Sequence, residues 1–133
     1  GPHEFAFALM PHGGHGARAE IARAAHELNA PPMLLPSPVS VPALVTADAP
    51  GVEIDSVKLA EDSDAVVVRL HENGGACVET MLRTGFTYAA CRETGILERA
   101  DGAAISTDGA PVRLTLRPYE IVTLLFEGAK ARG

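Results

Sequence analysis

The pattern of apolar and polar positions changes from a period of two to a helical period within the first 30 residues. From His3 to Met10, the apolar residues Phe5, Phe7 and Leu9 alternate with smaller or polar residues, which predicts a half-buried β-strand. The glycine-rich residues 11–16 then predict a loop. From Ala17 to Leu28 apolar positions recur at helical spacing, so we expect one short helix, ended by the prolines that follow.

The next segment, from Met33 to Pro50, contains short apolar pieces interrupted by prolines. Proline cannot donate a hydrogen bond to a neighbouring strand, so central strands of a sheet are excluded here. The segment is expected to form extended edge pieces or a crossing over the surface.

The remainder of the chain has the pattern of short strands separated by turns. The first two strands flank the polar turn Glu61–Asp64 and predict an antiparallel hairpin. The predicted strands are Val52–Ala60, Ala65–Glu72, Cys77–Arg83, Phe86–Cys91, Val112–Leu116 and Glu120–Phe126. This succession predicts a mainly β fold, an antiparallel β-sandwich with one short N-terminal helix, and residues 1–133 are interpreted as a single domain.

Composition narrows the possible functions. The 133 residues carry a formal net charge of −6, which argues against nucleic acid as a partner because its recognition needs clustered basic residues. No apolar run approaches the roughly 20 residues of a membrane span, so no membrane partner is expected. The start of the sequence lacks the basic and apolar regions of a secretory leader, and we therefore expect a cytoplasmic protein.

The two cysteines, Cys77 and Cys91, lie in neighbouring predicted strands. A disulfide between them is geometrically conceivable, but two cysteines do not make a disulfide framework. Unpaired buried thiols are the preferred interpretation, and the pattern leaves the redox state open.

Candidate catalytic chemistry is sparse. His12 and His15 suggest a metal site, but a zinc site usually needs three or four ligands and no third ligand is evident. Acidic residues gather at Glu61–Asp64, yet a hairpin turn supplies neither the burial nor the pocket that paired glycosidase carboxylates need. No serine lies in a nucleophile motif. We therefore assign no catalytic, cofactor-binding or metal-ligating residue within this chain.

Several segments, in order, resemble the C-terminal region of glycoside hydrolase family 38 α-mannosidases. The most recognisable pair is Val57–Asp64 and Val67–Glu72, which is similar to the family's V-K-x-A-E-D-x-D and V-R-L-x-E strands. The other matching segments are His3–His12, Ala25–Pro31, Thr94–Glu98 and Leu116–Leu124. Together they span nearly the whole chain with compatible spacing. One departure follows His12, where the family often has an Asp-Trp pair and this chain has Gly13–Gly16.

The resemblance implies a fragment of a larger, metal-dependent retaining glycosidase that hydrolyses terminal α-linked mannose. In the family, the catalytic residues and the zinc or other divalent metal belong to domains upstream, so this chain is expected to hold no cofactor and to be inactive alone. Its expected partners are the other domains of the enzyme and, for the full-length enzyme, a mannose-containing glycan. His12, Arg69 and Glu72 are the candidates for interdomain or sugar-facing contacts. The alternatives are a stand-alone carbohydrate-binding β-sandwich module and a free-standing metal protein that uses His12 and His15.

Overall fold

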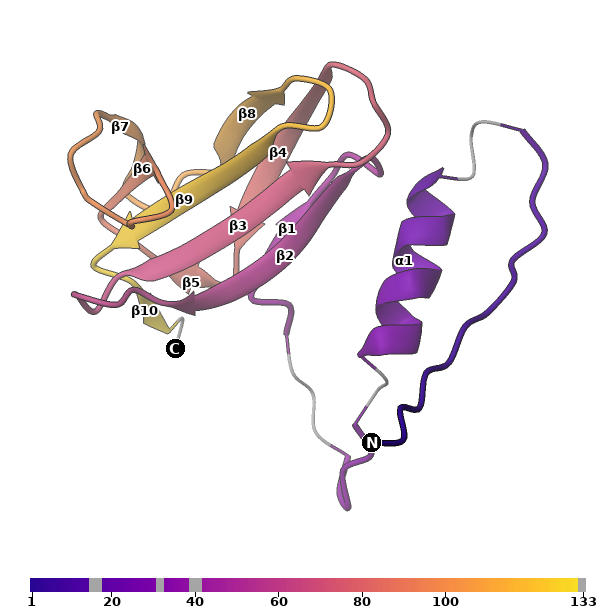
Figure 1. Ribbon diagram of the computed structural model, residues 1–133. Coiled ribbons are helices and arrows are strands. Elements are labelled where there is room, and N and C mark those ends of the chain that lie inside the picture. Colours follow the sequence, from indigo (N-terminus) through magenta and orange to yellow (C-terminus); the bar gives the residue numbers. More distant parts are fainter. Residues whose placement is uncertain (15–17, 31–32, 39–41, 132–133) are drawn as a thin grey trace.

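The computed structural model describes residues 1–14, 18–30, 33–38 and 42–131. In these residues the chain forms one helix, α1 (Arg18–Asn29), and ten strands (Figure 1). The strands are β1 (Val45–Ala47), β2 (Val52–Leu59), β3 (Val66–Glu72), β4 (Val78–Thr84), β5 (Phe86–Thr87), β6 (Ala90–Thr94), β7 (Ala104–Thr107), β8 (Val112–Leu116), β9 (Ile121–Glu127) and β10 (Lys130–Ala131).

The longer strands form two antiparallel sheets that face each other (Figure 1). One sheet has the order β2-β3-β9-β6-β7 and the other the order β1-β4-β8, and β5 pairs separately with β10. The predicted antiparallel β-sandwich with one short N-terminal helix is therefore confirmed, and β1 lies at a sheet edge, as expected for the proline-interrupted segment. The described residues contain no helix long and apolar enough to cross a membrane.

The core lies between the two sheets and follows the period of two. In β8, the odd-even alternation is complete, with Val112, Leu114 and Leu116 buried and the residues between them exposed. Phe126 of β9 makes edge-to-face contacts with Phe86 and Tyr88, with ring centroids 5.5 and 4.9 Å apart. Such contacts let few aromatic residues contribute strongly to a core that is otherwise aliphatic.

The predicted hairpin of β2 and β3 contains a β-bulge. Ile54 pairs with Leu70 and Ser56 pairs with Arg69, so Asp55 is the extra residue on β2. This explains why the apolar alternation of the sequence shifts by one position between Ile54 and Val57. A bulge also redirects the side chain that it contains, and here it turns Asp55 toward β3.

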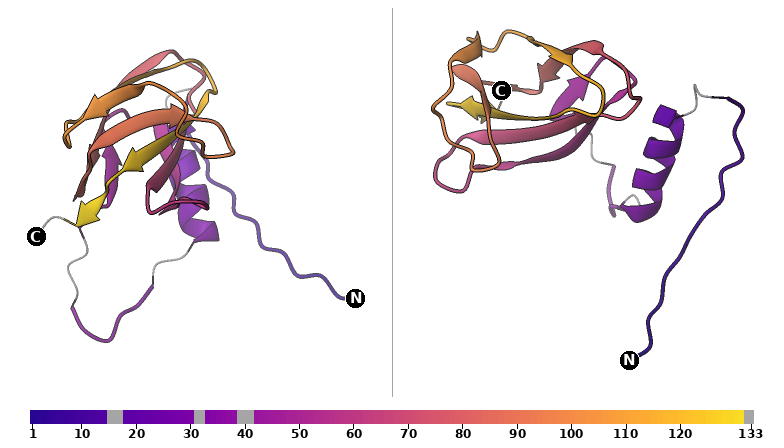
Figure 2. Two further views of the ribbon diagram at one scale, coloured as in Figure 1. Left: turned by 90° about the vertical axis from the view of Figure 1, so that its left-hand side faces the viewer. Right: turned by 45° about the horizontal axis from the view of Figure 1, so that its top comes forward.

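The strand predicted over residues 3–10 is wrong for the structure of this chain. Those residues carry no regular secondary structure, and Phe5, Phe7 and Leu9 are all exposed. A strand needs a neighbour for its backbone hydrogen bonds, and the pattern of side chains alone does not supply one. Figure 2 shows this N-terminal stretch extending away from the sandwich, with α1 between them in the right-hand view.

Candidate functional site

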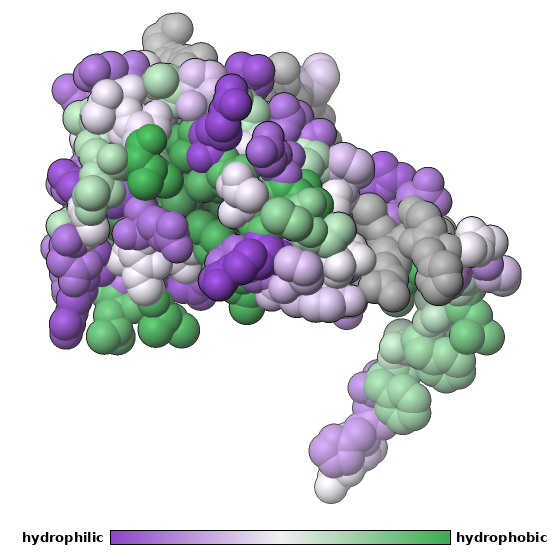
Figure 3. Space-filling view, turned by 90° about the horizontal axis from the view of Figure 1, so that it is seen from above, coloured by the Kyte–Doolittle hydropathy of each residue, from purple (hydrophilic) through white to green (hydrophobic). Residues whose placement is uncertain are grey.

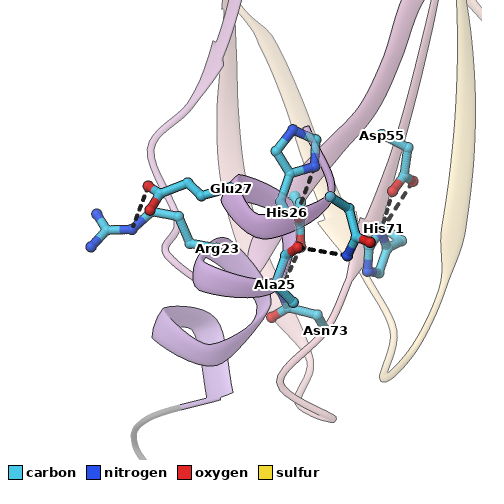
Figure 4. Close-up of polar contacts among 9 residues, drawn as sticks. Arg23, Ala25, His26, Glu27, Asp55, His71 and Asn73 are labelled. Atoms are coloured by element: carbon cyan, nitrogen blue, oxygen red, sulfur yellow. Dashed lines mark hydrogen bonds and ion pairs between the residues drawn. The ribbon is translucent and has the colours of Figure 1, made fainter. Parts of the chain in front are cut away.

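One hollow lies between α1 and the β2 edge of the sandwich. It has a volume of about 510 Å³, and its lining includes Glu20, Arg23 and His26 of the helix and Glu53 and Asn73 of the sandwich. The His26 Nδ1 lies 4.0 Å from a carboxylate oxygen of Glu53, and the Asn73 side-chain amide donates to the other oxygen at 3.2 Å. Figure 4 shows the helix side chains beside the paired strands. The contact between His26 and Glu53 therefore connects the helix to the sandwich, while the bond from Asn73 to Glu53 lies within the sandwich.

A second hollow, of about 460 Å³, lies on the other side of Asn73. Its lining includes Asp55, His71, Tyr119 and Ile121. The bulge brings the Asp55 carboxylate within 2.9 Å of His71 Nδ1, and both side chains stay partly exposed (Figure 4). A carboxylate beside an imidazole can orient the ring or accept its proton. Both hollows are open, with carboxylate and imidazole groups on their rims.

Glu72, which we expected to contact another domain, instead lies inside this one. Its side chain is 1% exposed, and its carboxylate accepts hydrogen bonds from the backbone amides of Gly74, Gly75 and Tyr119 at 2.7, 2.8 and 3.0 Å. The Tyr119 amide, helped by the two glycine amides, holds the pKa of the Glu72 carboxyl below its usual value although burial opposes this. Glu72 therefore joins the turn after β3 to the turn before β9.

A second polar cluster joins the β2–β3 turn to the loop after β6. Lys58 contacts the carboxylates of Glu61 at 2.7 Å and Glu98 at 2.9 Å, and Glu98 also accepts the backbone amide of Glu61 at 3.1 Å. The Lys58 ammonium accordingly lowers the pKa of the Glu98 carboxyl. Glu61 itself is exposed, in the polar turn that the sequence predicts.

The other two predicted contact residues, Arg69 and His12, differ in their exposure to solvent. Arg69 is partly buried on β3, and its Nε donates to the Thr123 hydroxyl on β9 at 3.3 Å. His12 is exposed in the N-terminal stretch. His15, the other half of the metal hypothesis, lies outside the described residues. Among the residues that are described, no three His, Cys, Asp or Glu side chains gather closely enough to hold a metal ion.

Both cysteines are unpaired. Cys77 is exposed and Cys91 is buried in the core, where burial raises the pKa of its thiol to about 12. The interpretation of unpaired thiols is confirmed, although only Cys91 is buried.

Sequence reasoning missed most of the polar contacts described above. No contact was predicted for five of the residues involved: His26, Glu53, Asp55, His71 and Asn73. Asp48 was also missed, although it accepts hydrogen bonds from the Met81 amide at 2.8 Å and the Thr80 hydroxyl at 3.1 Å. The one signal available was the shift of alternation at Asp55, which marks a bulge and hence a redirected carboxylate.

Comparison with known proteins identifies the fold and the family. Residues 51–124, which hold most of the sandwich, match the model of the glycosyl hydrolases family 38 C-terminal beta sandwich domain. Two relatives named alpha-mannosidase 2C1, from Homo sapiens and Mus musculus, are 34% and 32% identical to the chain over 134 aligned positions. Each alignment covers 95% of this chain and 13% of the relative, so the chain spans about an eighth of those proteins. The chain thus belongs to glycoside hydrolase family 38 and carries the C-terminal β-sandwich domain of that family.

Proposed function

We propose that this chain is the non-catalytic part of a metal-dependent, retaining enzyme that hydrolyses terminal α-linked mannose, and that it supports the packing of the other domains. The observation that carries the proposal is the match of residues 51–124 to the C-terminal sandwich of the family. The name of the two relatives, alpha-mannosidase, supports the substrate class.

The positions of the family-like motifs support a structural role. Glu72 ends one motif and accepts the Tyr119 amide from another. Lys58 belongs to a third motif and pairs with Glu98 at the end of a fourth. In each case a charged side chain joins two loops that are distant in sequence, and charge-assisted hydrogen bonds of this kind hold loops in fixed positions. The motifs therefore stabilise the sandwich and its turns.

The described residues do not fit the metal that the family implies, because they include no cluster of three metal-ligating side chains. We therefore assign zinc, or another divalent metal, to the remainder of the enzyme, together with the pair of catalytic carboxylates. Such a pair of carboxylates needs a pocket, because the pocket fixes the distance between the two groups and raises the pKa of one of them by burial. No catalytic step is derived from the residues of this chain.

The isolated chain should not turn over an aryl α-mannoside in the presence of zinc, whereas the longer polypeptide that carries it should. Deleting residues 45–133 from the longer polypeptide should lower the yield of folded enzyme, because its other domains would lose a packing surface. Robust mannoside hydrolysis by the isolated chain would contradict the proposal. Full activity and stability of the enzyme without the sandwich would contradict the packing role.

The cytoplasmic location is a further part of the proposal. The unpaired state of Cys77, which is exposed, is compatible with a reducing compartment, where thiols persist. Fractionation of cells that express the tagged, full-length protein tests this location, and recovery with secreted proteins would contradict it.

A carbohydrate-binding module is the second candidate function. Tyr119 is exposed beside the hollow that contains Asp55 and His71, and sugar sites combine an aromatic face with a few convergent polar groups. Titration of the labelled chain with mannose or mannobiose would place NMR shift changes at these residues if they bind sugar. Unchanged spectra at high ligand concentration would remove this candidate, and Tyr119→Ala is the matched variant for any shift that appears.

A further inference from the structure

The N-terminal stretch of the chain exposes a row of large apolar side chains. Phe5, Phe7 and Leu9 are 86%, 78% and 87% exposed, and they occupy alternate positions. In the space-filling view, the stretch forms an arm with many apolar residues that stands away from the body of the molecule (Figure 3). Three large apolar groups in a row are unfavourable in water, and contiguous exposure of this kind marks an interaction site.

The spacing of the three side chains specifies the conformation that would bury them. In a β-strand, alternate residues point to the same face, so Phe5, Phe7 and Leu9 would form one apolar face and Ala6 and Ala8 the opposite one. A strand forms stably only where an existing sheet offers an unpaired edge. An extended segment that adds to such an edge gains backbone hydrogen bonds and inserts alternate side chains into apolar pockets.

The sandwich of this chain is not the partner in the structure. The N-terminal stretch lies on the far side of α1 from the sandwich (Figure 2), and the core between the two sheets is already filled by residues from Val45 onward.

The comparisons indicate where the partner lies. The match to the family model begins only at residue 51 and lies within the sandwich. The alignments to the two relatives cover 95% of the chain and therefore also include most of residues 1–50. The relatives share most of this region, and they extend far beyond it, since the chain spans 13% of their length. For an apolar segment that is exposed in such a chain, we expect the binding surface to lie in the rest of the longer protein.

We propose that residues 3–10 add as a β-strand to an open sheet edge in the remaining part of the α-mannosidase polypeptide, with Phe5, Phe7 and Leu9 packed on its apolar face. The inference rests on the proposed function, because it takes the longer enzyme as the partner. Helix α1 and the exposed, apolar residues 33–35 then connect this strand to the sandwich, so that the chain is attached to the enzyme at two places.

Hydrogen exchange measured by mass spectrometry tests the proposal on the isolated chain and on the longer enzyme. In the isolated chain the amides of residues 3–10 should exchange at the rate of an unstructured peptide. In the longer enzyme their exchange should slow by about 100-fold or more, because strand pairing protects amides. Equal, fast exchange in both proteins would overturn the proposal. If the same enzyme still needs residues 45–133 for folding, the proposed function stands and only the inference fails.

Two substitutions in the longer enzyme separate strand addition from other causes of protection. Phe7→Asp should restore fast exchange in residues 3–10, because it puts a charge on the buried face. Ala6→Asp, on the opposite face, should leave the protection within about threefold of the parent enzyme. Equal loss of protection in both variants would contradict the proposed face. Protection that appears in the isolated chain together with a dimer mass would show that a second copy is the partner, which also overturns the proposal.

Discussion

Glu72 shows how a single residue can be fully buried and still keep its charge. Desolvation disfavours the charged form of a carboxylate, but three backbone amides donate to this one and their effect is the larger. Gly74 stands close to the same carboxylate, since a Cβ at that position would lie 2.8 Å from Glu72 Oε1. The two turns on either side of the residue therefore depend on a deprotonated glutamate.

Protonation of Glu72 should consequently lower the free energy of unfolding of the chain at acidic pH. Because its folded pKa is lowered, its contribution is fully present above the unfolded pKa, near 4.5, and is lost as the pH falls through the folded value. Glu72→Gln should lower the urea midpoint at pH 7 and should reduce the further loss between pH 5 and pH 3. Urea unfolding across this range measures both effects, and Glu79→Gln, at an exposed position, is the control. A Glu72→Gln chain as stable as the parent would contradict this role.

The cysteines should differ strongly in reactivity. Thiolate is the reactive species, and Cys91 is buried with a thiol pKa of about 12, whereas Cys77 is exposed. A chromogenic disulfide reagent at pH 8 should modify one thiol per folded chain quickly and the second only after unfolding. Cys77→Ser should remove the fast phase. A fast phase that persists in this variant would show that Cys91 is accessible.

At the scale of elements, β9 is the strand on which the sandwich most depends. It lies between β3 and β6 in the five-stranded sheet, and it is buried on both faces over most of its length. Leu124 and Phe126 point into the main core. Leu125 points the other way and packs with Val67 and Ala65 in a smaller cluster. This second cluster explains why Leu124, Leu125 and Phe126 are apolar in succession, in place of alternation.

Replacing a large side chain by alanine should therefore have very different effects at the two ends of β9. Phe126→Ala should reduce the free energy of unfolding by about 3–5 kcal/mol, since it removes a fully buried ring and leaves a cavity. Ile121→Ala, at a position that is 68% exposed, should change it by less than about 0.5 kcal/mol. Chemical denaturation of both variants measures the difference. Similar losses in the two variants would contradict the described core.

In the whole molecule, the sandwich has its own core, and the described residues before Val45 contribute no side chain to it. The main core is drawn from Val45 onward, while the described residues before it include most of the large, exposed apolar side chains. Helix α1 faces the sandwich across an open hollow, and the 4.0 Å contact between His26 and Glu53 joins an exposed side chain to a partly buried one. Such contacts contribute little to stability.

A chain that begins at Pro42 should accordingly fold and unfold cooperatively. It keeps the backbone hydrogen bond from Gly85 to Leu44, at 2.8 Å, and the whole of the main core. We expect its thermal midpoint to lie within about 5 °C of that of the 133-residue chain, because few buried contacts are lost. Thermal unfolding followed by circular dichroism measures this, and loss of a cooperative transition would show that the first 41 residues belong to the core.

The β-sandwich architecture and most of its strands could be predicted from the amino-acid sequence alone. Period-two burial and turn residues are local properties, and they specify the hairpin of β2 and β3 and the alternation of β8, whereas the bulge at Asp55 was not predicted. The resemblance carried by Val57–Asp64, Val67–Glu72 and Leu116–Leu124 also sufficed for the family. The strand β7 (Ala104–Thr107) was missed because its pattern is short and largely exposed.

The contacts of the charged residues and the conformation of the N-terminal stretch became known only from the three-dimensional structure. Glu72 and Tyr119 are 47 residues apart, and Lys58 and Glu98 are 40 residues apart, so no local pattern indicates that they meet. The alternation of Phe5, Phe7 and Leu9 specifies which face of a strand would be buried. Whether that strand forms depends on a neighbouring edge, because a β-strand, unlike a helix, makes its backbone hydrogen bonds with another segment.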